Sequence, residues 1–177
     1  MMTGDEYAQE YECSFEASVK GAVYAREVQR AREEGRVTRV PYDPSMLVDT
    51  DWDLGVGDAT AIWFTQTDYS GAVRAIDYYE STGKGLDHYK QVLTERGYTY
   101  GEHWAPHDIR VRELTSGHTR WETAAKLGIH FHITPQVQSL EDGIHSARML
   151  FPREGPGPCW IRWPHQARVF RNLRCCP

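Results

Sequence analysis

Four aspartates lie close together in the first third of the sequence. Asp49, Asp51 and Asp53 occupy every second position of the run VDTDWD, and Asp58 follows the glycine turn after it. Alternate residues of a β-strand point to the same side, so the first three carboxylates would share one face. Carboxylate oxygens are the ligands that Mg²⁺ prefers. The run therefore indicates either a metal site or a solvated strand at the edge of a sheet.

Asp108 is the second acidic candidate, and it follows the aromatic stretch HWAP. Pro106 ends a predicted strand there, so Asp108 lies just past the end of that strand. If this strand lies beside the one that carries Asp53, the two carboxylates meet at one sheet edge. Two metal ions held there can activate a water and stabilise the leaving oxygen of a phosphodiester. The alternative for Asp108 is a helix cap or turn residue.

Basic side chains near these acids are candidates for contacting DNA: Lys84, Arg110, Arg112 and Arg120. The net charge of -5 argues against a simple nucleic-acid coat protein, but the charge is uneven. Residues 1–60 hold thirteen acids and six bases, whereas residues 148–177 hold six arginines and one acid. Acids in one region can hold metal while bases elsewhere meet phosphate, although ordinary surface scatter gives the same numbers.

The segment from Gly55 to Thr60, GVGDAT, leaves a different function open. An acidic strand end, a glycine turn and a threonine also form the phosphate loop of actin-like ATPases, where backbone N–H groups hold the phosphate. Those proteins need two such loops and a longer chain. The sequence contains no G-x-x-x-x-G-K-[ST] motif, so it carries no P-loop motor.

The elements that must position these residues follow from periodicity and turn signals. Strands are predicted at 46–53, 59–66, 72–80, 98–106 and 129–134, and helices at 21–34, 86–96, 119–127 and 139–151. Gly35, Gly97 and Gly128 are placed to end three of the helices, and Thr119 with Glu122 has capping-box spacing. Leu140, Ile144, Ala147 and Phe151 have the spacing of a core-facing helix side. A three-stranded meander followed by alternating helices and strands predicts a mixed α/β sheet with helices on both faces.

Length and cysteine usage narrow the class of protein. The chain has 177 residues, which suits one domain, and no apolar run approaches the roughly 18 residues of a membrane span. Its polar, acidic start is not a secretory signal. The four cysteines form no C-x-x-C pair, which predicts a reducing compartment without disulfides or structural zinc.

Three runs give the sequence a specific resemblance: DLGVGDATAIWFTQ, AIDYYESTGKGLDHYKQVL and GYTYGEHWAPHDIRVRELTSGHTRWETAAKLGI. Together they resemble the nuclease domain of phage and prophage terminase large subunits. The segment QEYECSFEASVKGAVYAREV resembles the part that leads into that domain from the packaging motor. The resemblance covers about residues 8–153. It divides the chain into a connector and helix at 1–40, a nuclease domain at 41–153 and an irregular tail at 154–177.

The resemblance implies a ribonuclease-H-like fold and an endonuclease that cuts concatemeric double-stranded DNA during packaging. It implies a site of three carboxylates with two Mg²⁺ or Mn²⁺ ions. Asp53 matches the first family acid, Asp108 matches the second, and Asp58 matches a recurrent acid beside the site. The implied partners are DNA, the terminase ATPase domain, the small subunit and the portal, in the host cytoplasm and away from membranes.

The third family acid lies on a helix near the end of the domain, in an H-x-x-D-A-like segment that this sequence lacks. Asp142 lies on a helix that the family shares, but not on the catalytic one. We therefore expect this chain to cut DNA poorly or not at all. Two alternatives stay open, a non-catalytic DNA-binding or packaging remnant of a decayed prophage and an actin-like nucleotide-binding domain.

Overall fold

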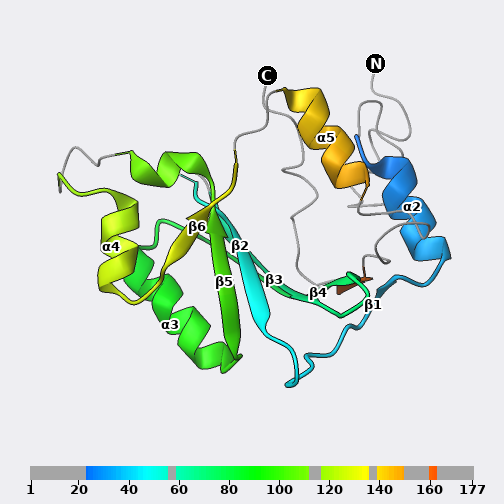
Figure 1. Ribbon diagram of the computed structural model, residues 1–177, viewed down its shortest axis with the longest axis horizontal. Coiled ribbons are helices and arrows are strands. Elements are labelled where there is room, and N and C mark those ends of the chain that lie inside the picture. Colours follow the sequence, from blue (N-terminus) through cyan, green and yellow to red (C-terminus); the bar gives the residue numbers. More distant parts are fainter. Residues whose placement is uncertain (1–22, 56–58, 112–116, 136–138, 150–159, 163–177) are drawn as a thin grey trace, which may run out of the picture.

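A mixed β-sheet forms the centre of the molecule (Figure 1). The structure is a computed structural model that describes residues 23–55, 59–111, 117–135, 139–149 and 160–162. Within these ranges the sheet has seven strands in the order β1-β7-β4-β3-β2-β5-β6. The strands are β1 (Val37–Thr38), β2 (Val48–Asp53), β3 (Ala59–Thr67), β4 (Val73–Thr82), β5 (Tyr100–Ala105), β6 (Phe131–Ile133) and β7 (Trp160–Arg162).

The five strands from β2 to β6 have the predicted arrangement. β2, β3 and β4 form an antiparallel meander, with Asp53 opposite Ala61 and Ala61 opposite Glu80. β5 then pairs parallel with β2, and β6 pairs parallel with β5. The crossover from β4 to β5 passes through a helix, as a parallel connection requires. The predicted α/β, ribonuclease-H-like mixed sheet is confirmed.

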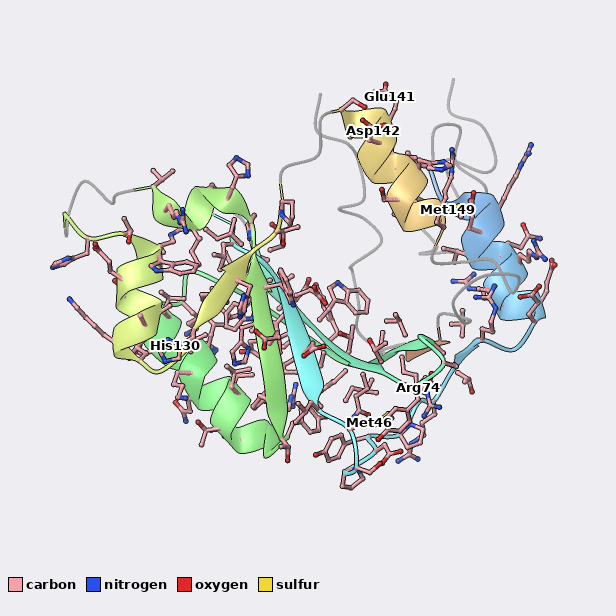
Figure 2. All side chains as sticks on the ribbon, viewed as in Figure 1. Met46, Arg74, His130, Glu141, Asp142 and Met149 are labelled. Carbon is pink, nitrogen blue, oxygen red and sulfur yellow. The ribbon has the colours of Figure 1, made fainter. Side chains whose placement is uncertain are left out.

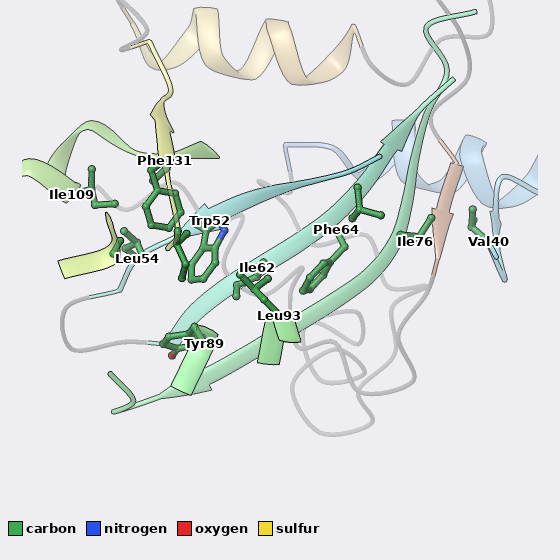
Figure 3. Packing of buried hydrophobic residues seen from close by; sticks show 14 residues of the cluster. Val40, Trp52, Leu54, Ile62, Phe64, Ile76, Tyr89, Leu93, Ile109 and Phe131 are labelled. Carbon is green, nitrogen blue, oxygen red and sulfur yellow. The ribbon is translucent and has the colours of Figure 1, made fainter. Parts of the chain in front are cut away.

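One face of the sheet carries the core. Along β3, Thr60, Ile62, Phe64 and Gln66 are buried while their neighbours are partly exposed, which is the alternation of a strand covered on one side. Trp52 of β2 lies at the centre of the core and contacts Tyr89 and Phe131 edge to face. Figure 3 shows Trp52, Tyr89 and Phe131 close together with other apolar side chains on this face of the sheet.

Two helices cover this core face, and their ends follow the predicted chemistry. α3 (Leu86–Arg96) ends at Gly97, whose φ of 65° is the left-handed conformation that favours glycine. α4 (Arg120–Lys126) begins with the predicted capping box, in which Thr119 and Glu122 bond each other's backbone N–H groups. Between β5 and α4 lies a short 3-10 helix, η1 (His107–Arg110).

The remaining helices, α2 (Ala25–Glu33) and α5 (Leu140–Arg148), lie together away from α3 and α4 (Figure 1). Arg148 links them through an ion pair with Glu27 and a hydrogen bond to the carbonyl oxygen of Val23. The core spacing predicted for this helix is wrong for Leu140, Ile144 and Ala147, because α5 has no buried residue and Leu140 is 55% exposed. Phe151, the fourth residue of that spacing, lies outside the described residues. An amphipathic pattern shows which side of a helix is apolar, but not whether a partner covers that side.

Two strands have no counterpart in the sequence analysis. β7 lies in the segment expected to be irregular, and it lies between β1 and β4 and pairs parallel with both. The proposed division at residues 40 and 153 stays a prediction. None of the described helices has the length and apolar character needed to cross a membrane.

Candidate functional site

The parallel pairing of β2 with β5 brings the two principal acidic candidates to one edge of the sheet. In the register, Asp51 is opposite Trp104, so Asp53 is level with Pro106. Asp108 follows within η1, one turn past the end of β5. Both carboxylate residues are exposed. Asp108 therefore lies on a 3-10 turn just beyond the strand rather than at the strand's last residue.

The other two aspartates of β2 have different environments. Asp49 accepts a hydrogen bond at 2.8 Å from the backbone N–H of Glu102, at the bulge where β5 shifts register against β2. Although Asp51 keeps solvent contact, its pKa is raised by lost hydration and then by the charge of Asp49, while a hydrogen bond from Thr65 opposes the shift. Asp49 thus stabilises the pairing of β2 with β5. Lost hydration and the neighbouring Asp49 charge together disfavour the ionised form of Asp51.

Asp53 faces a polar pair on β4. The Tyr78 hydroxyl donates to Glu80 at 2.7 Å. The pKa of Tyr78 is raised first by burial, then by that hydrogen bond and by the charges of Glu80 and Asp53. Sequence reasoning did not single out Glu80. Its position follows only from the register that places Asp53, Ala61 and Glu80 in one row across three strands.

A partly buried chain of hydrogen bonds links three side chains of β2 and β5. The Trp52 indole Nε1–H donates to Thr50 Oγ1 at 2.8 Å, and Thr50 Oγ1 lies 2.6 Å from His103 Nδ1. Burial lowers the pKa of His103, with Lys90 adding to the effect. A neutral imidazole accepts on Nδ1 when Thr50 donates its own proton, and both ends of the chain are then satisfied. This chain joins β2 to β5 just before the edge where Asp53 and Asp108 lie.

The predicted basic residues separate into two groups. Lys84 and Arg120 line one pocket at the same edge of the sheet, together with Leu54, Gly55 and Thr60. The guanidinium of Arg110 instead lies over the ring of Trp121, 5.1 Å from its centroid. Arg112, like Asp58, lies outside the described residues.

The donor chemistry of this edge fits a hard divalent cation. Asp53 and Asp108 offer carboxylate oxygens in solvent, where water can complete the coordination shell. Among the described residues, no three histidine, cysteine, aspartate or glutamate side chains are close enough together to hold a metal ion. Asp142 is exposed at the start of α5, which Figure 2 shows outside the strands, and its backbone N–H bonds the Ser139 cap.

Solved structures with a similar fold include terminase nucleases. The large terminase nuclease of thermophilic phage G20c, crystallised with bound zinc, is 15% identical with a TM-score of 0.52, over 81% of this chain and 85% of that one. The P22 large terminase nuclease domain is 16% identical with a TM-score of 0.51, over 72% and 69%. The large terminase of thermophilic bacteriophage D6E is 15% identical with a TM-score of 0.50, over 73% and 31%.

These likenesses establish the fold. The chain has the fold of the large terminase nuclease domains, as the sequence resemblance predicted, and it spans about a third of the D6E large terminase. No protein family's sequence profile matches the chain, and no curated protein matches it in sequence.

Proposed function

We propose that this chain is a divalent-metal-dependent nuclease domain of a phage DNA-packaging terminase, which cuts double-stranded DNA slowly. The observation that supports the proposal is the parallel pairing of β2 with β5, because Asp53 ends β2 and Asp108 follows β5 on η1, in a sheet with the fold of the G20c terminase nuclease. Zinc in the G20c nuclease structure supports a metal-dependent chemistry. Asp58 is proposed as the acid beside this pair.

The residues of the site have distinct proposed roles. Asp53 and Asp108 hold Mg²⁺ or Mn²⁺, which supplies Lewis acidity toward a phosphodiester oxygen when bound. Arg110, placed on η1 two residues after Asp108, meets the phosphate backbone with Arg112. The Thr50–His103 contact keeps the two strand ends in register. Cutting is slow because two carboxylates hold the ions less firmly than the three of the complete family site.

In a virus-infected host cytoplasm, the domain would act with the ATPase domain, small subunit and portal of the packaging machinery. These partners come from the family resemblance and are proposals for this chain. Mg²⁺ and Mn²⁺ are preferred to zinc because the two candidate ligands are carboxylates, whereas zinc favours nitrogen and sulfur.

The test combines Mn²⁺ calorimetry with plasmid nicking, on the wild type, Asp53→Ala and Asp108→Ala. Glu141→Ala, which removes an exposed carboxylate from α5, is the matched control. We expect Mn²⁺ binding and slow nicking in the wild type and the control, and loss of both in the two site variants. Nicking that persists in Asp53→Ala would refute the proposal.

A non-catalytic DNA-binding role is the second candidate. It is favoured by the lack of a three-ligand cluster among the described residues. The same assay separates the two, because DNA retained equally with EDTA and Mn²⁺, with no nicking in either, supports binding without catalysis.

A further inference from the structure

A tryptophan of α4 contacts the arginine that follows Asp108 in η1. The guanidinium carbon of Arg110 lies over the Trp121 ring, 5.1 Å from its centroid. Tryptophan attracts a cation over its face more strongly than the other aromatic rings do, and 5.1 Å is within the roughly 6 Å reach of that attraction. Trp121 also packs against the hydrophobic core, so the ring has a fixed place beneath the guanidinium.

The backbone on both sides of this contact is anchored. Ile109, the residue before Arg110, is fully buried, and Figure 3 shows it among the core side chains. On α4, the capping box that begins at Thr119 orders the first turn, which carries Trp121, and Ala124 one turn later is fully buried. The backbones are therefore held by the fold, and the ring orders the exposed arginine side chain.

The guanidinium keeps its hydrogen-bonding edge when it stacks. It turns one flat face to the ring, and its five N–H donors point outward in the plane. Arg110 is exposed, and within the described ranges it forms no hydrogen bond or ion pair. The acid next to Trp121, Glu122, instead accepts from the Thr119 N–H at 3.0 Å, and its Oε2 lies 3.5 Å from His118 Nδ1. The charge of Arg110 is therefore available to an anion.

The chain itself relates Arg110 to the candidate metal site. Arg110 is two residues after Asp108, so their Cα atoms are at most about 7 Å apart. Three residues complete a 3-10 turn, so Asp108 and Arg110 lie on different sides of the buried Ile109. Successive phosphates of one strand are about 3.4 Å apart along the duplex axis. A strand with one phosphate at Asp108 can therefore present a nearby phosphate to Arg110.

We propose that Trp121 is a positioning residue, which holds the Arg110 guanidinium so that it binds one backbone phosphate of a DNA strand at Asp108. The inference rests on the proposed nuclease function and deepens it by naming the residue that orients this DNA contact. A planar guanidinium can meet two phosphate oxygens at once. A ring that fixes its plane in advance reduces the side-chain freedom lost on binding.

The experiment measures binding of a 20-base-pair duplex in EDTA, so that cutting plays no part. Arg110→Gln should weaken binding about tenfold, the effect of losing a charged hydrogen bond. Trp121→Leu removes the ring but leaves the charge, and it should weaken binding about threefold. Trp121→Phe keeps a ring face and should recover most of that loss. The matched control Lys126→Gln, at the exposed end of α4, should change affinity less than twofold.

Combining the two substitutions separates positioning from packing. If Trp121 acts through Arg110, Trp121→Leu should leave the affinity nearly unchanged in the Arg110→Gln background. A loss of about threefold in both backgrounds overturns the inference, because the ring then acts on the DNA or on the fold directly. Circular dichroism checks that each variant is folded, and Trp121→Met is the second variant without a ring.

Salt dependence tests the phosphate contact without any change at Trp121. Arg110→Gln should reduce the slope of log K against log salt by about 0.9, the contribution of one phosphate. An unchanged slope, or an affinity like that of Lys126→Gln, overturns the inference, and so does a wild type that does not bind the duplex at low salt. None of these results decides the proposed function, because Mn²⁺-dependent nicking and its loss in Asp53→Ala are measured separately.

Discussion

Thr50→Val tests whether the buried hydrogen-bond chain holds the two site-bearing strands together. Thr50 is fully buried, and its hydroxyl bonds both Trp52 Nε1 at 2.8 Å and His103 Nδ1 at 2.6 Å. Valine has nearly the same shape, so packing is kept while both bonds are lost. The indole N–H then has no acceptor, which costs about 1–3 kcal/mol, and the lost bond to His103 adds about 1 kcal/mol.

We therefore expect Thr50→Val to lower the free energy of unfolding by about 2–4 kcal/mol, measured by urea denaturation with far-ultraviolet circular dichroism. Thr67→Val, at the exposed end of β3, is the control and should stay within about 0.5 kcal/mol. Trp52→Phe removes the donor, so Thr50→Val should cost about 1–2 kcal/mol less in that background. A cost no larger than that of Thr67→Val, or strict additivity with Trp52→Phe, would refute the reasoning.

Three other predictions concern the scaffold of the site. Gln66 is fully buried and makes three hydrogen bonds of 2.8–2.9 Å to the backbone of Asp43 and Met46. Gln66→Leu should therefore lower the free energy of unfolding by about 3 kcal/mol in urea denaturation. The control Gln91→Leu, on the exposed side of α3, should change it little. At Gly101 a Cβ would lie 3.2 Å from the Cβ of Leu47 and displace the side chain of Asp49. Gly101→Ala should therefore lower the free energy of unfolding by about 1–3 kcal/mol. Any loss of Mn²⁺ affinity in this variant should come only from the disturbed pairing of β2 with β5. Asp51→Asn and Asp68→Asn should have opposite effects on thermal midpoints. The raised pKa of Asp51 gives stability below pH 3.8 that is lost as the pH rises through the folded value, so its amide should stabilise at pH 7 and not at pH 3. Hydrogen bonds from Ser70 and Ala72 and the charge of Arg74 lower the pKa of Asp68. The stability that ionised Asp68 contributes is therefore present above pH 3.8 and is lost as the pH falls through the folded pKa. Asp68→Asn should lower the thermal midpoint at pH 7 and match the wild type in acid.

Features set by local chemistry could be predicted from the sequence. Gly97 ends α3 because a left-handed residue closes a helix, and Thr119 begins α4 because its side chain satisfies a free N–H group. The alternation of β3 was visible for the same reason, since a strand covered on one face repeats every two residues. These signals need only a few neighbouring residues, and they place Asp53 at a strand end.

Features set by distant pairing could not be predicted in the same way. β1 and β7 have two and three residues, too few for a period, and they pair across more than a hundred residues of chain. Gln66 lies in an apolar run that predicts a strand, but its burial depends on the segment at Asp43 and Met46 folding back over it. Glu80 joins the row of Asp53 only through the register of β2, β3 and β4.

In the candidate site, the contacts that pair the two strands are separate from the side chains proposed to bind metal. The bond from the Glu102 N–H to Asp49 and the Thr50–His103 contact fix the pairing of β2 with β5, and both lie within the strands rather than at their tips. Asp53 and Asp108 lie beyond these contacts and are exposed, so replacing either side chain leaves both contacts in place. Carboxylates at such an edge can be lost at little cost in stability, because removing an exposed charge rarely changes folding by more than about 0.5 kcal/mol. Metal binding, rather than stability, is therefore the measurement that reports on these two carboxylates.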